Sequence, residues 1–167
     1  VVNPIRNDHG ERIGTVVEWD DQTEELKRLA EERRVSTDNA RIKQALDNVS
    51  ANVMVANADR EIIYMNDAVI KTMRAAESDI QKELRNFSVS TLIGSNIDIF
   101  HKNPAHQKGM LEALKSEHSA NLVIGGRHMD LVVNPILSSE QERIGTVVEW
   151  ADRTNEVAIE QEIDRLV

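Results

Sequence analysis

The sequence predicts an α+β domain built on a five-stranded antiparallel sheet, with helices on one face and a linker helix at each end. Strand-like stretches come as a pair, a region of helical character follows, and three more strand-like stretches complete the module. Residues 1–26 also recur as residues 132–157, with 17 of 26 positions identical. A repeat of this length indicates two tandem copies of one module.

The first copy of the repeat holds only the end of a module. In both copies one strand ends at Asn-Pro, a polar loop follows, and the return strand ends in Val-Val-Glu-Trp. We therefore expect residues 1–20 to be the C-terminal β-hairpin of a truncated upstream domain, and residues 49–152 to be an intact module. Two strands alone bury no core, so we expect the hairpin to be mobile or to pack against a neighbour.

The segment between the hairpin and the module, residues 21–48, is predicted to be a linker helix. It is rich in Glu, Arg, Lys, Ala and Leu and contains no Pro or Gly. Val35, Ile42 and Val49 recur every seven residues, which fits a short coiled-coil seam. A single amphipathic helix that lies on its own domain fits the same pattern equally well.

A second helix is predicted after the module, over residues 153–167. Its apolar residues recur at i, i+4 and i+7, which is the spacing of one helix face. They are Ile159, Ile163 and Leu166. We expect this segment to be the start of an output helix.

The intact module begins with a predicted hairpin over residues 52–66, in which two apolar stretches flank a polar turn at 57–60. Residues 67–117 lack strand patterning and are compatible with helices, and Pro104 suits the first turn of a helix that runs to Lys115. The last three strands are predicted near residues 119–124, 127–136 and 143–151.

The composition argues against several functions. A net charge of −9 and a pI near 5.1 argue against nucleic-acid binding, which needs clustered Lys and Arg. There is no signal peptide and no apolar run of the roughly 18–20 residues that a membrane span needs, so we expect a soluble fragment without a membrane segment. The absence of Cys excludes disulfides, thiolate nucleophiles, iron–sulfur ligation and covalent haem attachment. No Ser/His/Asp arrangement, phosphate-binding glycine loop or convincing pair of carboxylates suggests an enzyme.

Strand alternation predicts which side chains share the covered face of the sheet. In the penultimate strand these are Met129, Leu131 and Val133. In the last strand they are Ile144, Thr146, Val148 and Trp150. An indole that faces inward usually packs in the core. Alternation alone does not decide whether Trp150 has this role or contributes to a binding site.

Two histidines, His101 and His106, stand five residues apart in the helical region. Two zinc ligands on one helix prefer a spacing of three or four residues, and Pro104 interrupts the stretch, so a metal pair is not predicted. The pattern by itself favours one His with a local hydrogen bond and one in solvent.

Several motifs of the intact module resemble those of PAS domains. They are the strand IIYMN, the Asn-Pro hairpin that ends in GTVVEW, and the Asp-x-Thr step at Asp152 and Thr154. The segment SVSTLIGSNIDIFHKNPAHQ, residues 88–107, is similar to the haem-binding PAS domains of bacterial aerotaxis-type, methyl-accepting chemoreceptors. The resemblance covers the whole module and the tail of a preceding PAS domain.

The resemblance implies a cytoplasmic sensor that binds b-type haem and a diatomic gas such as O₂, CO or NO. In that family a His after the Asp-Ile-Phe segment ligates the haem iron, and this position is His101; His106 matches a second His with a supporting role. Leu131 and Trp150 match the residues beside the gas, where an indole N–H donates to O₂.

The resemblance also implies signalling through the flanking helices to adjacent signalling domains of the receptor, and we expect a homodimer through these helices. Val133 and Val148 are among the apolar side chains expected around the haem. A shift of Trp150 on gas binding is expected to alter the strand-to-helix junction at Asp152, a predicted N-cap of the exit helix.

Two other functions compete with the haem sensor. The module fits a cofactor-free PAS domain that dimerises through its flanking helices and relays motion from the upstream domain. It also fits a flavin-binding redox sensor, although the lack of Cys excludes a thiol photoadduct and the few aromatic residues offer little ring stacking.

Overall fold

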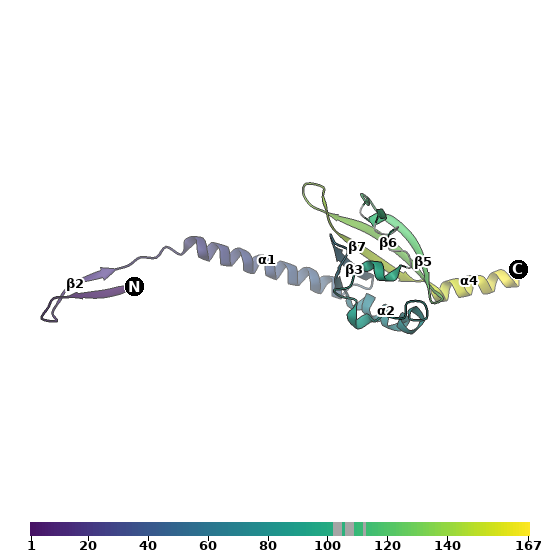
Figure 1. The fold of residues 1–167 in the computed structure, drawn as a ribbon, viewed down its shortest axis with the longest axis horizontal. Coiled ribbons are helices and arrows are strands. Elements are labelled where there is room, and N and C mark those ends of the chain that lie inside the picture. Colours follow the sequence, from purple (N-terminus) through teal and green to yellow (C-terminus); the bar gives the residue numbers. More distant parts are fainter. Residues whose placement is uncertain (102–104, 106–108, 112) are drawn as a thin grey trace. The chain divides into compact units, whose positions relative to one another are not determined.

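The computed structural model describes residues 1–101, 105, 109–111 and 113–167. The chain divides into two compact units, Val1–Lys43 and Gln44–Val167. The described elements are β1 (Val2–Arg6), β2 (Arg12–Val17), α1 (Thr23–Asp47), β3 (Asn52–Asn57), β4 (Ile62–Met65), α2 (Asp67–Ile80), the 3₁₀ turns η1 (Val89–Thr91) and η2 (Ile97–Phe100), β5 (His118–Ile124), β6 (Arg127–Leu137), β7 (Arg143–Asp152) and α4 (Thr154–Leu166) (Figure 1).

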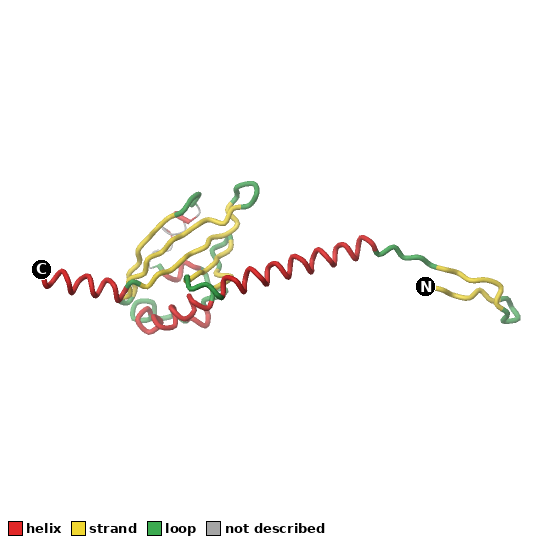
Figure 2. The backbone as a smooth tube through the Cα atoms, turned by 180° about the vertical axis from the view of Figure 1, so that it is seen from behind, coloured by secondary structure: helices red, strands yellow, loops and turns green. Residues whose placement is uncertain are grey.

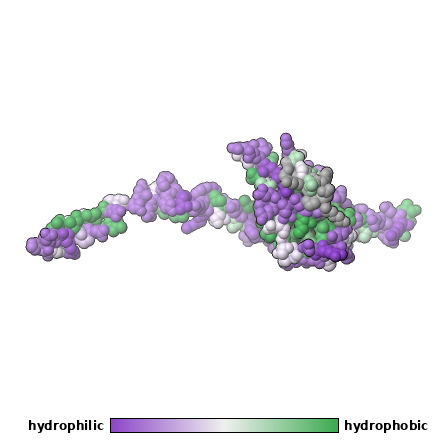
Figure 3. Space-filling model, viewed as in Figure 1, coloured by the Kyte–Doolittle hydropathy of each residue, from purple (hydrophilic) through white to green (hydrophobic). Residues whose placement is uncertain are grey.

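The first unit begins with the predicted hairpin, in which β1 and β2 pair antiparallel from Val2 opposite Val17. The side chain of Asn7 closes its turn by accepting the backbone N–H groups of His9 and Glu11, each at 3.0 Å. Hydrophobic side chains lie along the surface of the hairpin (Figure 3). Every residue of β1 is exposed, as expected for two strands without a core to cover.

The helix predicted before the module is α1, and none of its residues is buried. Ion pairs along its surface, such as those of Arg28 with Glu25 and Glu32 at 2.5 Å, support the helix by a few tenths of a kcal/mol each. The apolar side chains of Val35 and Ile42 are exposed. The structure therefore leaves the predicted seam open to solvent.

The second unit contains a five-stranded antiparallel sheet among its described residues, in the order β4-β3-β7-β6-β5. Figure 2 draws its strands in yellow. The helix α2 packs on one face of it (Figure 1), and the turn η1 packs against α2. The predicted α+β class is confirmed. The core lies between this face and the helical segments and is centred on the fully buried side chains of Phe87, Met54, Ile62, Met73, Ile80, Leu92, Met129 and Val69.

Asn66 connects the end of α1 to this core. Its side-chain NH₂ donates to the carbonyl oxygens of Leu46 and Ala51, at 2.9 and 2.8 Å. Its side-chain oxygen accepts the backbone N–H groups of Val53 and Val69, at 3.0 and 3.1 Å, and so caps α2. Asn66 is completely buried. Through these four contacts the buried amide ties the last turn of α1 to the starts of β3 and α2.

Strand alternation predicts the covered face correctly with one exception. Met129, Leu131 and Val133 are buried, but Ile144 is 53% exposed. The register of β7 with β6 shifts at this point, from Gly145 opposite Ile136 to Arg143 opposite Leu137. Ile144 is the residue that the shift leaves unpaired, so the alternation breaks there.

Two other expectations need correction or lie outside the described residues. Asp152 is the last residue of β7, and the cap position of α4 is Arg153. The predicted N-cap is therefore wrong by one residue, although the Asp152 carboxylate still accepts the backbone N–H of Thr154 at 3.0 Å. The helix predicted from Pro104 to Lys115 falls partly on residues that the structure does not describe.

Candidate functional site

A cavity lies between the covered face of the sheet and the turn η2. The empty space between its lining atoms is about 800 Å³, which includes some open solvent. Its lining is mostly apolar and comes from η2, β5, β6 and β7. A mostly apolar cavity with a few polar groups is the usual form of a small-molecule site.

The sheet wall of the cavity is built from two neighbouring rows of side chains. Leu131 on β6 pairs with Trp150 on β7, and Val133 pairs with Val148 in the next inward row. On its other side Val133 pairs with His118, the first residue of β5. Because alternate residues face the same side, all five project into one space.

Trp150 carries a polar atom without a protein partner. The residue is 4% exposed, and its ring lies 4.8 Å from that of Phe100 at an angle of 50°. The buried indole Nε1 has no hydrogen-bond partner among the described residues. An indole N–H only donates, and a buried donor without an acceptor costs about 1–3 kcal/mol. Trp150 therefore combines an unsatisfied buried donor with a place in the lining of the cavity.

His101 stands at the end of η2 on the opposite wall. The buried side chains of Ile97 and Phe100 anchor the turn in the core, and the backbone N–H of His101 donates to the carbonyl of Asp98 at 3.0 Å. The imidazole is half-buried. Burial lowers the pKa of His101, and the negative charge of Asp98 offsets part of this shift. The neutral form that ligates metals is thereby favoured.

The structure brings together five of the six residues that the sequence assigns to a site. His101, Leu131, Val133, Val148 and Trp150 all line the cavity. The sixth, His106, lies outside the described residues.

Sequence reasoning missed other lining residues, among them His118, Asn121 and Met110. The strand was predicted to begin at residue 119, one residue late. Extending it by one residue would have set His118 opposite Val133.

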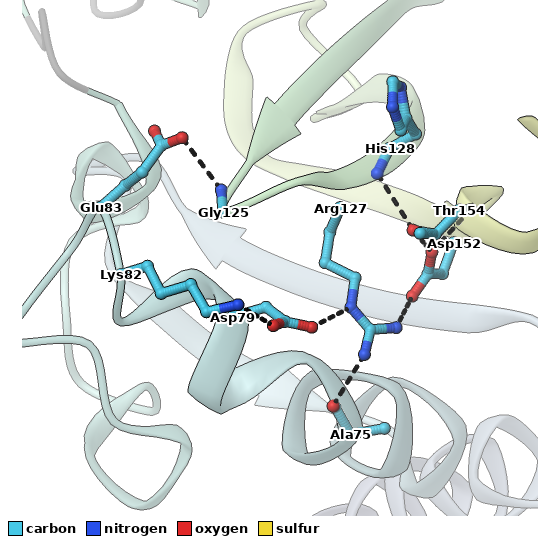
Figure 4. A network of polar contacts seen from close by, with 9 residues as sticks. All are labelled: Ala75, Asp79, Lys82, Glu83, Gly125, Arg127, His128, Asp152 and Thr154. Atoms are coloured by element: carbon cyan, nitrogen blue, oxygen red, sulfur yellow. Dashed lines mark hydrogen bonds and ion pairs between the residues drawn. The ribbon is translucent and has the colours of Figure 1, made fainter. Parts of the chain in front are cut away.

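The last strand leads from Trp150 to a polar junction at the start of α4. The carboxylate of Asp152 accepts from Arg127 at 3.0 Å, and Arg127 also donates to Asp79 of α2 at 2.7 Å (Figure 4). The backbone N–H of His128 donates to the Thr154 hydroxyl at 3.1 Å. These contacts join α2, the β5–β6 turn and the first turn of α4.

The charges of this junction shift both carboxylates in the same direction. Hydrogen bonds from Lys82 and Arg127 lower the pKa of Asp79. Burial alone would raise the pKa of Asp152, but hydrogen bonds from Thr154 and Arg127 outweigh it and lower the pKa. Both groups are therefore ionised at neutral pH and hold the junction together.

Three comparisons with known proteins agree with this architecture. A family model described as "PAS domain" matches residues 40–104. The methyl-accepting chemotaxis protein McpB of Pseudomonas aeruginosa is 54% identical over 129 residues, which are 77% of this chain and 19% of that protein. The chain thus spans about a fifth of that relative's length.

Two solved structures extend the comparison. The Aer2 receptor of Vibrio cholerae, described as a dual PAS-haem oxygen sensor, is 30% identical with a TM-score of 0.54, over 61% of this chain and 93% of that one. The PAS domain of an HTR-like protein from Haloarcula marismortui is 14% identical with a TM-score of 0.50, over 74% of this chain and 98% of that one. The second likeness concerns the fold alone.

Proposed function

Because this chain belongs to the PAS-domain family, we propose that its intact module, residues 49–152, is the haem-based gas sensor of a bacterial chemoreceptor. The observation that carries the proposal is the buried indole N–H of Trp150, which lacks an acceptor among the described residues and borders an apolar cavity. His101 lies on the wall of the same cavity. The described relative from Vibrio cholerae is a PAS-haem oxygen sensor, which supports the assignment.

The residues around the cavity fit b-type haem. His101 supplies an imidazole whose pKa is lowered by burial, so a neutral nitrogen is available as an iron ligand. The apolar side chains of Val133 and Val148 line the wall and suit a flat apolar ring. Non-covalent binding is consistent with a chain that contains no Cys.

Bound haem would supply an iron that can take up a diatomic gas. His101 would hold the group through an imidazole nitrogen. Leu131 would limit the room beside the gas, and Val133 and Val148 would exclude water. Trp150 would donate its N–H to O₂, which accepts a hydrogen bond far better than CO does. The family resemblance assigns a supporting role to His106, which lies outside the described residues.

Signalling follows the last strand. Trp150 lies two residues before Asp152, whose contacts with Arg127 and Thr154 fix the start of α4. A change in the position of the indole is therefore transmitted to the junction and to the output helix. The output helix passes this change to adjacent signalling domains in a cytoplasmic region of the receptor. The module itself carries out no enzymatic step. No helix in the described part of the chain is long and apolar enough to span a membrane.

We also propose that residues 1–20 are the last two strands of an upstream PAS domain, joined to the sensor through a linker helix over 21–48, and that 153–167 begins the output helix. Trp19 occupies the repeat position of Trp150. Its side chain is 90% exposed in the described residues.

The second candidate function is a cofactor-free PAS module that dimerises and relays motion. Exposed apolar side chains on the flanking helices favour it, namely Val35, Ile42, Ile159 and Ile163. The same side chains support a homodimer in the haem-sensor proposal. Dimerisation therefore does not separate the two functions, whereas haem binding does.

Titration with haem tests the proposal. We expect the unaltered protein to bind haem with a Soret band that shifts with O₂ and CO, and His101→Ala to lose that ligation. His118→Ala is the matched control because His118 lines the same cavity from β5, and it should keep the gas-sensitive spectrum. A folded protein that binds no haem would favour the cofactor-free module instead.

A further inference from the structure

The turn η2 sets Asp98 beside His101. In a 3₁₀ helix, residues three apart lie on the same face. Ile97 and Phe100 form one such pair and are buried in the core. His101 directly follows the turn with an extended backbone, and its backbone N–H donates to the Asp98 carbonyl at 3.0 Å, which keeps the two residues close. The charge of Asp98 also acts on the pKa of the imidazole.

Asp98 is held by one contact of its backbone and one of its side chain. Its own backbone N–H donates to the side-chain oxygen of Asn96 at 2.9 Å. One carboxylate oxygen, Oδ2, lies 3.4 Å from Nε of Arg60, and the two side chains are only 16% and 13% exposed. The turn that carries Arg60 is tied to η2, because the N–H of Ile97 donates to the Arg60 carbonyl at 2.8 Å.

The other carboxylate oxygen, Oδ1, is buried and has no hydrogen-bond partner among the described residues. Leaving a buried acceptor unpaired costs about 1–3 kcal/mol, and more when the group is charged. Such atoms are rare in folded proteins and call for a donor. A neutral imidazole has one ring N–H to donate while its other nitrogen binds a metal.

We propose that Asp98 is a positioning residue for His101, whose ring N–H donates to Asp98 Oδ1 while the other ring nitrogen faces the haem iron. The inference rests on the proposed haem site. Histidines that bind metals almost always donate their second ring N–H to a carboxylate, a carbonyl or water. This contact fixes the tautomer and the orientation of the ring. It also raises the basicity of the other ring nitrogen, which makes that nitrogen a stronger ligand for the metal. Arg60 in turn orients the carboxylate.

Asp98→Asn tests the proposal in the haem-loaded protein. The amide keeps the size of the side chain and removes the charge, so we expect haem affinity to fall about 10- to 100-fold. The iron–histidine stretching band in the Raman spectrum of the reduced protein should move to lower frequency. Asp59→Asn is the matched control, because Asp59 undergoes the same change of charge in an exposed position of the neighbouring turn, and it should leave both readouts unchanged.

The outcomes separate this proposal from the proposed function. If the unaltered protein binds no haem through His101, the proposed function fails. If it binds haem and Asp98→Asn matches it in affinity and in the iron–histidine band, only the role of Asp98 is overturned.

A second measurement needs no variant, so it tests the proposal even if the Asp98→Asn protein does not fold. It follows the exchangeable ring N–H of His101 by proton NMR in the haem-loaded protein. Slow exchange with solvent is expected for a proton held by a buried carboxylate, and rapid exchange would overturn the proposal.

Discussion

Leu131 and Trp150 are direct partners across β6 and β7, and both face the covered side of the sheet. Together they form the part of the cavity wall that the proposal assigns to the gas. Trp150 contributes a polar N–H group to the wall, and the Leu131 side chain limits the room beside it. The pairing makes the two residues neighbours in space although they are nineteen apart in the sequence.

Leu131→Ala should destabilise the domain and enlarge the cavity. Loss of a buried Leu side chain costs about 2–5 kcal/mol, and we expect the lower end because Leu131 borders space that is already open. Urea unfolding measures the change. Leu137→Ala is the matched control at the exposed end of the same strand, with an expected change of about 0.5 kcal/mol or less. Equal effects of both changes would contradict the position assigned to Leu131.

The hydrogen bond between Tyr64 and Asp47 makes the free energy of unfolding depend on pH in the alkaline range. The Tyr64 hydroxyl donates to the Asp47 carboxylate at 2.7 Å, and burial together with this bond raises the pKa of Tyr64 to about 12. The protonated phenol is therefore favoured by the folded state. Its contribution is complete below the ordinary pKa of about 10 and is lost as pH rises toward 12.

Tyr64→Phe provides the comparison for this pH dependence. The variant should lack the additional loss of stability between about pH 10 and pH 12. Because the chain contains a single Tyr, phenolate absorbance reports the titration directly. Ionisation at the ordinary pKa in the folded protein would show that the contact with Asp47 does not hold.

Gly125 and Gly126 in the β5–β6 turn give a matched pair of substitutions. Both have positive φ, +58° and +82°, but a Cβ at Gly125 would lie 1.8 Å from the Asp79 carbonyl oxygen, whereas one at Gly126 meets nothing within 4 Å. Gly126→Ala should cost about 1–3 kcal/mol from backbone strain. Gly125→Ala should cost about 1–3 kcal/mol more, because the turn must move away from α2. Similar melting temperatures for both variants would refute this close approach.

The sequence predicts the sheet well because its signals are local. Alternation identifies the inward residues of β6, and the repeat marks the final hairpin before any fold is known. The error at Ile144 has a non-local cause, since the irregularity that breaks the alternation lies in the pairing of β7 with β6.

The site itself is only partly readable from the sequence. The PAS resemblance points to His101 and Trp150, but no pattern shows that the indole N–H lacks an acceptor. His118 and Asp98 are also missed. The first enters the cavity through the register of β5 with β6, and the second is recognised by an unpaired buried oxygen, which only coordinates reveal.

The affinity of the haem-loaded protein for O₂ and CO, measured in the unaltered protein and in Trp150→Phe, tests the central claim most directly. Phe keeps an apolar ring and removes the N–H. A hydrogen bond to a charged acceptor is worth about 1.5–3 kcal/mol, so O₂ affinity should fall roughly 10- to 100-fold while CO affinity changes little. Equal changes for both gases, or none for O₂, would contradict the assignment of Trp150 as the donor.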